Sequence, residues 1–237
     1  MNRAPTAAPP RSGITPLVDV RVARPEDLWA SPGPDALLAS LSPAEVDRAA
    51  RFRFDVDRRA YIAAHHLLRT ALAERLGSAD PATVALRTGP GGRPELAFDR
   101  GVSFNLSHTR GMVACALSGA AAVGVDVEGV RPLPDLASLA RSVLTDVEAR
   151  ELMTHPPALR SRAFMRRWTA KEAYAKATGQ GLALPLSAIA VVDADRDRPV
   201  IHDAATGRRL PGVQIDVTAL GPGHLLAVAT ITRGRPR

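Results

Sequence analysis

The chain has 237 residues, 46% of them hydrophobic, and a formal net charge of +7 at pH 7. This composition indicates a globular protein with one large core or two small ones. No apolar run approaches the roughly 18 residues of a membrane span, and the chain does not open with a basic and then an apolar segment, so we expect neither membrane association nor export. The charge favours an acidic partner, which could be nucleic acid, a membrane surface, a phosphorylated ligand or an acidic protein.

Cysteine and lysine are both scarce. Cys115 is the only cysteine, which excludes an internal disulfide and fits a reducing, cytoplasmic environment. Its small apolar neighbours in "MVACALSG" predict an inert, buried thiol. Of the 31 basic residues only Lys171 and Lys176 are lysines, and they lie five residues apart in "WTAKEAYAKATG". Lysine is a compact charge whose pKa shifts readily, so this pair is a candidate for a functional role.

The first half begins with a polar, proline-rich tail at residues 1–16, which we expect to be mobile. A strand is predicted over residues 17–24, where apolar and polar residues alternate. Ser42 and Glu45 form a capping box that opens a helix. Helical spacing then runs over residues 57–76, with Gly77 as the expected C-cap. Four strand-like runs follow, "TVALRTG", "GVSFNLS", "MVACALS" and "AVGVDVE".

The second half repeats this plan. Thr145 and Glu148 form a second capping box, 103 residues after the first, and "RWTAKEAYAKATG" aligns with "HHLLRTALAERLG" at an offset of 102, which sets Arg69 opposite Lys171. Three more strand-like runs come next. We therefore predict an α+β fold of two pseudo-symmetric duplicated halves, residues 17–128 and 129–237. Each is expected to pack a long helix on a small, mostly antiparallel sheet, with the active site at the seam between them.

Asp126 and Glu128 lie in the strand-like run "AVGVDVEG". Residues two apart on a strand share a face, so their Cα atoms should lie roughly 6.6 Å apart. Two like charges at that distance repel by on the order of 2.5 kcal/mol at an effective dielectric constant near 20. Either the pair lies at an exposed strand end, or it binds a hard divalent cation such as Mg²⁺ or Mn²⁺ together with phosphate oxygens.

The helix that carries both lysines also carries Glu172, which shares a face with Lys176. Such a pair can be an ordinary surface salt bridge worth about 0.3 to 0.5 kcal/mol. Trp168 and Tyr174 make this helix unusually aromatic for this chain, and large apolar neighbours make the pKa of a nearby acid or base easier to shift. Glu172 is thus a third candidate metal ligand.

The stretch "VSFNLSHTRG" ends a strand-like run in polar residues, among them Ser107 and His108. Hydroxyl, imidazole and backbone N–H groups at a strand end suit a phosphate, although a polar turn with a surface histidine fits equally well. Adjacent strand residues point apart, so Ser107 and His108 make no catalytic dyad. A group of arginines in the first half could form an anion-binding wall or simply a solvated surface; its members are Arg51, Arg53, Arg58, Arg59, Arg69 and Arg93.

Taken together, "FNLSHT", "GVDVE" and "RRWTAKEAYAKATGQGL" resemble the 4′-phosphopantetheinyl transferase superfamily, in particular its double-length, monomeric branch. The resemblance implies transfer of the phosphopantetheine arm of coenzyme A to a serine of an apo acyl, peptidyl or aryl carrier protein, with release of adenosine 3′,5′-bisphosphate. Carriers of this class are commonly acidic, which fits the net positive charge. The double length favours carriers of polyketide or nonribosomal peptide synthesis.

The same resemblance implies the roles of individual residues. Mg²⁺ would be held by Asp126, Glu128 and Glu172, and Glu172 would also be the base for the carrier serine. Lys176 would contact the phosphate under attack. The residues implied to hold coenzyme A are Ser107, His108, Lys176, Arg93 and, more weakly, Arg53, Arg58, Arg59 and Arg69. Arg93 stands where many members have a lysine before proline, which keeps the charge and changes the geometry.

Two other functions use the same residues differently. A metal-dependent phosphodiesterase or nuclease could use these carboxylates with water as the nucleophile, but such sites often place a lysine two residues after the second acid, where this chain has Val130. A nucleic-acid-binding module would exploit the positive charge, yet 4% aromatic residues offer few stacking platforms. We therefore expect no nucleic-acid partner.

Overall fold

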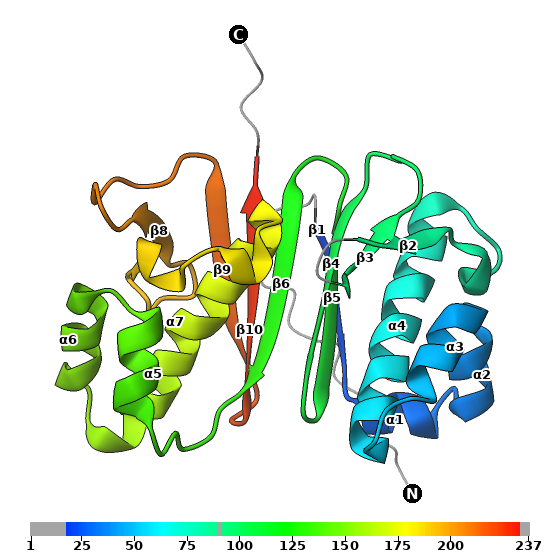
Figure 1. The fold of residues 1–237 in the computed structure, drawn as a ribbon, viewed down its shortest axis with the longest axis horizontal. Helices are drawn as coiled ribbons and strands as arrows, with labels where there is room; N and C mark the ends of the chain where they lie inside the picture. The colour runs from blue at the N-terminus through cyan, green and yellow to red at the C-terminus, as the bar shows by residue number, and fades with distance from the viewer. Residues whose placement is uncertain (1–17, 90–91, 233–237) are drawn as a thin grey trace, which may run out of the picture.

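The computed structural model describes residues 18–89 and 92–232, so the tail predicted at residues 1–16 lies outside the described residues. Two halves lie side by side (Figure 1). The first contains β1 (Val18–Ala23), α1 (Pro25–Ala30), α2 (Pro34–Ala39), α3 (Pro43–Ala49), α4 (Asp55–Leu76), η1 (Pro81–Thr83), β2 (Leu86–Thr88), β3 (Pro94–Leu96), β4 (Ser103–Thr109) and β5 (Met112–Ser118).

The second half contains β6 (Ala122–Gly129), α5 (Leu136–Val143), α6 (Asp146–Thr154), α7 (Pro157–Thr178), η3 (Gly181–Ala183), η4 (Leu186–Ala188), β7 (Ile189–Val192), β8 (Val200–Asp203), β9 (Val213–Leu220) and β10 (His224–Ile231). None of the helices among the described residues is long and apolar enough to cross a membrane.

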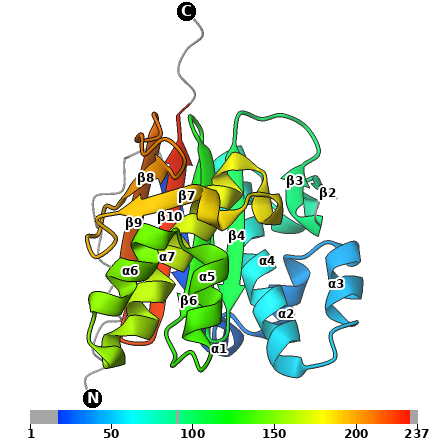
Figure 2. The same cartoon turned by 60° about the vertical axis from the view of Figure 1, so that its left-hand side comes forward.

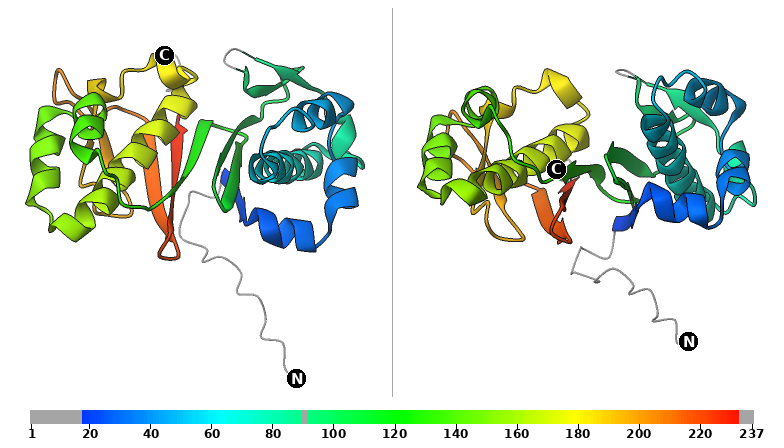
Figure 3. Two further views of the ribbon diagram at one scale, coloured as in Figure 1. Left: turned by 60° about the horizontal axis from the view of Figure 1, so that its bottom comes forward. Right: turned by 90° about the horizontal axis from the view of Figure 1, so that it is seen from below.

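Each half has one antiparallel three-stranded sheet and one long helix. The strand orders are β1-β5-β4 and β6-β10-β9, and two-stranded ribbons, β2-β3 and β7-β8, flank them. The two main sheets lie in the middle, with helices on either side (Figure 3). Helices α5 and α6 pack beside α7 in the second half (Figure 2). The predicted duplicated α+β fold is confirmed.

Local signals in the sequence account for the helices. Both predicted capping boxes form, at Ser42 with Glu45 and at Thr145 with Glu148. The long helices α4 and α7 end at Gly77 and Gly179, whose φ angles of 69° and 78° are left-handed conformations that glycine adopts without strain.

The partner of β6 differs from the expectation. We placed residues up to 128 in the first half, but β6 pairs with β10 along its whole length, from Ala122 opposite Ile231 to Gly129 opposite His224. The boundary therefore falls in the short turn at residues 119–121. Alternation of apolar and polar residues predicts a strand but does not predict which strand it pairs with. For this reason the sequence pattern alone grouped β6 with the strand that precedes it.

The line where β4 meets β6, here called the seam, joins the halves. One face of β6 is apolar, and its valines pack with residues of β5 and β10 in a cluster that spans both sheets: Ala114, Ala116, Val123, Val125, Val127, Leu226 and Val228. The opposite face carries Gly124, Asp126 and Glu128 and packs against α7. This alternation leaves the acids of β6 facing the helix that carries Glu172 and Lys176.

Candidate functional site

Gly124 allows α7 to approach β6 unusually closely. A Cβ atom built on Gly124 would lie 2.1 Å from the carbonyl oxygen of Ala173 and 2.4 Å from the amide nitrogen of Ala177. The helix presents small side chains at this contact, since Ala173 is fully buried and Ala177 nearly so. With no side chain between them, the backbones of strand and helix touch, and this contact sets the height of Glu172 and Lys176 above Asp126.

Ser107, Asp126 and Lys176 form a hydrogen-bonded triangle across the seam. Lys176 Nζ lies 2.6 Å from Asp126 Oδ1 and 3.1 Å from Ser107 Oγ, and Ser107 donates to the same Asp126 oxygen at 2.9 Å. Ser107 also accepts the N–H of Val127 at 3.2 Å, so its hydroxyl uses its donor and both lone pairs. The triangle draws one residue each from β4, β6 and α7, and so depends on both halves.

The second carboxylate oxygen of Asp126 has no partner. Oδ2 is buried and accepts no hydrogen bond from any described residue. A buried acceptor left alone costs free energy, on the order of 1 to 3 kcal/mol, unless a ligand satisfies it. Two further acids, Glu128 and Glu172, lie close enough to Asp126 for its negative charge to raise the pKa of each.

Glu128 is held by two donors. Trp168 Nε1 donates to Oε1 at 3.3 Å, and Thr109 Oγ1 donates to Oε2 at 3.5 Å. Burial and then the negative charge of Asp126 raise the pKa of Glu128 above its usual value. The sequence indicated Trp168 only as an aromatic residue on the helix of Glu172. In the structure its indole N–H donates a hydrogen bond to Glu128.

Glu172 does not form the surface salt bridge that its spacing from Lys176 allows. Lys176 turns to Asp126 instead, and no ion pair reaches Glu172 among the described residues. Burial raises the pKa of Glu172, and Asp126 adds to this effect. Glu172 thus has no ion-pair contact among the described residues, although the charge of nearby Lys176 partly offsets the rise in its pKa.

These acids fit a hard cation only in part. Among residues 18–89 and 92–232 no three His, Cys, Asp or Glu side chains form a ready ligand cluster. The unpartnered Asp126 oxygen and two carboxylates with raised pKa values are nonetheless groups that a divalent cation would satisfy. The residues present are therefore compatible with a site in which a substrate supplies further oxygens.

His108 borders two cavities next to this triangle. A cavity of about 660 Å³ runs between α1, the start of α4 and the β4–β5 turn, and one of about 350 Å³ lies between α3, α4 and the β2–β3 ribbon. Burial lowers the pKa of His108, and the electrostatic influence of neighbouring His65 and Lys176 adds to the effect. Arg93 lines the second cavity and a third of about 310 Å³, which also reaches Lys176.

Comparison with known proteins decides the family. A model described as 4′-phosphopantetheinyl transferase superfamily matches residues 122–228, and one described as 4′-phosphopantetheinyl transferase, N-terminal, matches residues 31–119. The chain is 32% identical over 163 residues to the 4′-phosphopantetheinyl transferase AcpT of Salmonella typhimurium, a match that covers 69% of this chain and 75% of that protein. The chain belongs to the 4′-phosphopantetheinyl transferase superfamily.

Other relatives agree. The 4′-phosphopantetheinyl transferase HetI of Nostoc sp. is 39% identical over 150 residues, and the match covers 62% of this chain and 63% of HetI. Sfp of Bacillus subtilis is 24% identical over 157 residues, with 66% of this chain and 68% of Sfp covered. The chain thus spans less than two thirds of the length of HetI. The tandem match of two models supports the double-length, Sfp-like branch of the superfamily.

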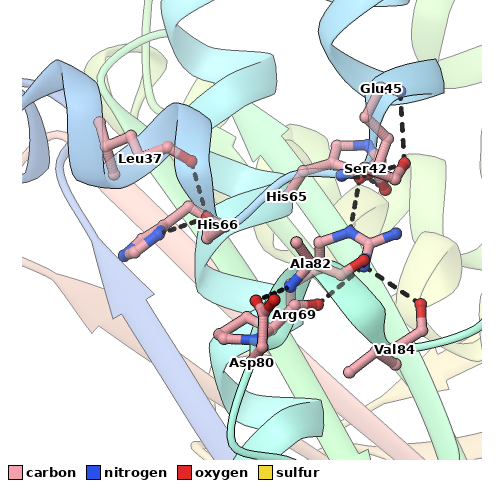
Figure 4. A network of polar contacts seen from close by, with 11 residues as sticks. Leu37, Ser42, Glu45, His65, His66, Arg69, Asp80, Ala82 and Val84 are labelled. Carbon is pink, nitrogen blue, oxygen red and sulfur yellow. Dashed lines mark hydrogen bonds and ion pairs between the residues drawn. The ribbon is translucent and has the colours of Figure 1, made fainter.

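Arg69 is held in place by the fold, and it also lines the cavity of about 350 Å³. Its side chain is 2% exposed, and Nε donates to Glu45 at 2.5 Å (Figure 4). A second nitrogen donates to three carbonyl oxygens, those of Pro81, Ala82 and Val84. These bonds occupy much of the guanidinium, so Arg69 ties α3, α4 and the η1 segment together.

The equivalent position in the second half behaves in the same way. Lys171 is fully buried, and its ammonium group donates to Glu148 at 2.7 Å and to the carbonyl oxygens of Val143 and Leu186. Glu45 and Glu148 are the capping-box glutamates of the two halves. The duplicated plan thus includes one buried ion pair per half, and Lys171 is structural.

The remaining arginines of the predicted wall lie at the surface. Arg58 and Arg59 both pair with Asp55, and Arg53 stacks over the ring of Phe54. Arg59 also borders the cavity of about 660 Å³. The superfamily resemblance did not single out Arg48 or Arg87, and both line the cavity of about 350 Å³ with His108 and Arg93. Arg48 follows Glu45 by one helical turn, a spacing that could have indicated it.

Proposed function

We propose that this chain transfers the 4′-phosphopantetheine arm of coenzyme A to a serine hydroxyl of an apo acyl, peptidyl or aryl carrier protein and releases adenosine 3′,5′-bisphosphate. The observation that carries the proposal is the triangle of Ser107, Asp126 and Lys176 with the unpartnered, buried Asp126 Oδ2 beside it. A cation, a hydroxyl and an unsatisfied acid oxygen within one cluster suit a diphosphate ester. The named relatives support the same reaction.

In this proposal the carrier serine oxygen attacks the phosphorus that bears the pantetheine arm. The bond from that phosphorus to the bridging oxygen breaks, and the bridging oxygen leaves with the electron pair as part of adenosine 3′,5′-bisphosphate. Glu172 accepts the serine proton, a role that suits a half-buried carboxylate whose pKa is raised by burial and by Asp126. Lys176 has two of its three N–H donors in the triangle and can give the third to the phosphate under attack.

Asp126, Glu128 and Glu172 are the proposed ligands of Mg²⁺ or Mn²⁺. When bound, the cation would shield the negative diphosphate and stabilise charge on the departing phosphate. The unpartnered Asp126 Oδ2 is the donor atom that supports this assignment most directly. Trp168 and Thr109 fix the orientation of Glu128 from outside the site.

The proposed place for the nucleotide part of coenzyme A is the cavity of about 350 Å³. His108 and Arg93 lie in its lining, and we assign them to the 3′-phosphate end of the substrate. Arg48 and Arg87 add positive charge to the same lining. A polyanionic nucleotide is attracted to such a wall, whose arginines can hold phosphate through two parallel N–H bonds.

The acceptor is proposed to be an acidic carrier domain of polyketide or nonribosomal peptide synthesis, met in the cytoplasm by a monomeric enzyme. The net charge of +7 would attract such a domain, and the triangle draws all three of its residues from one chain.

The test incubates the purified chain with Mg²⁺, coenzyme A and a panel of apo acyl, peptidyl and aryl carriers, and follows intact carrier mass. We expect the carrier to gain one phosphopantetheine, and Asp126→Asn to abolish the gain while the circular dichroism spectrum stays unchanged. Asp195→Asn, at an exposed aspartate remote from the triangle, is the matched control. A folded chain that modifies no carrier of the panel and instead cleaves DNA or RNA refutes the proposal.

A further inference from the structure

The two halves meet through side chains rather than through a continuous sheet. Among the described residues no backbone-to-backbone hydrogen bond joins β4 to β6, and the two strands belong to separate sheets. Instead, side-chain oxygens of β4 accept N–H groups of β6. The three bonds run from Val123 to Ser103 at 3.1 Å, from Val125 to Asn105 at 3.2 Å and from Val127 to Ser107 at 3.2 Å.

These bonds form a regular ladder. Donor and acceptor differ by 20 residues at every rung, so the strands run parallel, and every second residue of β4 takes part. The three valines are 3% exposed or less, so their N–H groups cannot form hydrogen bonds with solvent water. A buried N–H must find an acceptor, and here each has one side-chain oxygen.

The second and third bonds of the ladder lie on either side of Asp126 in the sequence. Val125 precedes it, Val127 follows it, and their N–H groups point at β4 while the Asp126 side chain points at α7. Ser107 belongs to the ladder and to the triangle, whereas Asn105 belongs to the ladder alone. We infer that Asn105 is a positioning residue, which holds β6 through the Val125 N–H and thereby sets Asp126 against Lys176.

The bond from Val125 to Asn105 should matter more for the position of Asp126 than the bond from Val123 to Ser103. Without Asn105, the ladder would hold the backbone of β6 through the N–H groups of Val123 and Val127 alone, four residues apart. The segment between them includes Asp126, whose Oδ1 must meet Lys176 Nζ at 2.6 Å. Ser103 anchors the strand at Val123, three residues before Asp126, where Gly124 packed on α7 already restrains the chain. Loss of the Ser103 rung should therefore leave Asp126 in place.

Three variants test this inference. Asn105→Ala removes the acceptor, Asn105→Asp keeps an oxygen at the same position, and Ser103→Ala removes a neighbouring rung as the matched control. Amide hydrogen exchange of the chain alone reports the ladder directly. We expect Asn105→Ala to speed exchange at Val125 and Asp126 by about 10-fold or more, as the loss of a buried hydrogen bond implies, and Asn105→Asp to restore protection. Ser103→Ala should speed exchange at Val123 alone.

The second readout rests on the proposed function. In the carrier assay we expect Asn105→Ala to lower kcat by about 10-fold or more while KM for coenzyme A changes less than about 3-fold, because the acid moves and the nucleotide wall does not. Asn105→Asp should recover kcat, and Ser103→Ala should keep it within about 3-fold. If Asn105→Ala fails to fold, Asn105→Leu, which keeps the branched shape of the side chain and removes the acceptor, gives the same comparison.

The results separate the two proposals. Unchanged exchange at Val125 in Asn105→Ala, or an equal loss of kcat in Asn105→Ala and Ser103→Ala, overturns the positioning role. If the parent chain modifies no carrier, the proposed function fails, and the exchange data still decide whether Asn105 holds the strand that carries Asp126.

Discussion

Replacing Gly124 by alanine tests the contact that sets α7 over β6. A Cβ there would lie 2.1 Å from the Ala173 carbonyl oxygen, whereas ordinary contact begins at 3.4 Å, so strand and helix must separate by roughly 1.3 Å (3.4 Å less 2.1 Å). Both nearest atoms are backbone, which cannot rotate away as a side chain would. Overpacking of this kind costs about 1 to 3 kcal/mol.

The separation should reduce activity more than stability. Lys176 belongs to α7 and Asp126 belongs to β6, so their 2.6 Å bond crosses the contact that the substitution would widen. A displacement of about 1 Å in a catalytic group costs on the order of 100-fold in rate. We therefore expect Gly124→Ala to lower kcat/KM for carrier modification by about that factor. The melting temperature should fall by roughly 2 to 12 °C, as a loss of about 1 to 3 kcal/mol implies for a domain of this size.

The assay compares transfer rates and thermal unfolding of Gly124→Ala with those of Gly129→Ala. Gly129 ends the same strand, but a Cβ there meets nothing within 4 Å, and its φ is not left-handed, so alanine should be tolerated. If Gly124→Ala matches Gly129→Ala in both kcat/KM and melting temperature, the close contact of strand and helix does not position Lys176 and the reasoning is wrong.

Three further outcomes are expected. Lys171→Met should destabilise the chain by about 3 to 5 kcal/mol in urea denaturation, because it strands the buried Glu148 carboxylate, whereas Lys176→Ala should mainly abolish transfer. Burial would raise the pKa of Glu45, but hydrogen bonds from His65, the Ser42 backbone and Arg69 outweigh it and lower that pKa to about 2. Stability from Glu45, on the order of 3 kcal/mol, is thus complete above pH 4.5 and lost as the pH falls toward 2; Glu45→Gln should flatten this loss in urea titrations at pH 6 and pH 3. His108→Ala should raise KM for coenzyme A more than it lowers kcat, and an unchanged KM would argue against its place beside the nucleotide.

The sequence predicted those parts of the fold whose signals are contiguous. A capping box needs only residues such as Thr145 and Glu148, three apart, and Gly77 ends a helix wherever it follows one. The two long helices and the duplicated plan were therefore found. Strand partners depend on residues far apart in the chain, as Ala122 and Ile231 are, so β6 was assigned to the wrong half.

The candidate site was predicted from residue types and order, and its geometry was not. The sequence predicted three residues of the site, Asp126, Ser107 and Lys176. Their mutual hydrogen bonds depend on the close contact of β6 with α7 at Gly124, and no local sequence pattern predicts that contact. Arg69 has a structural role that its charge alone does not indicate. Its charge suggested a phosphate, although its offset from Lys171 equals, within one residue, the offset between the two capping-box glutamates, and that coincidence points to a buried ion pair in each half.

The duplication also explains why helix α4 does not repeat the site proposed at α7. The alignment that sets Arg69 opposite Lys171 sets Thr70 opposite Glu172 and Glu74 opposite Lys176. The structural cation is thus kept in both helices, whereas the proposed base, Glu172, and the proposed phosphate-binding cation, Lys176, occur in α7 only. Glu74 is committed elsewhere, since it pairs with Arg21 of β1 at 2.6 Å. Helix α4 therefore cannot repeat the chemistry proposed for α7, and in our proposal its half contributes Ser107, His108 and the cavity walls to the site at the seam.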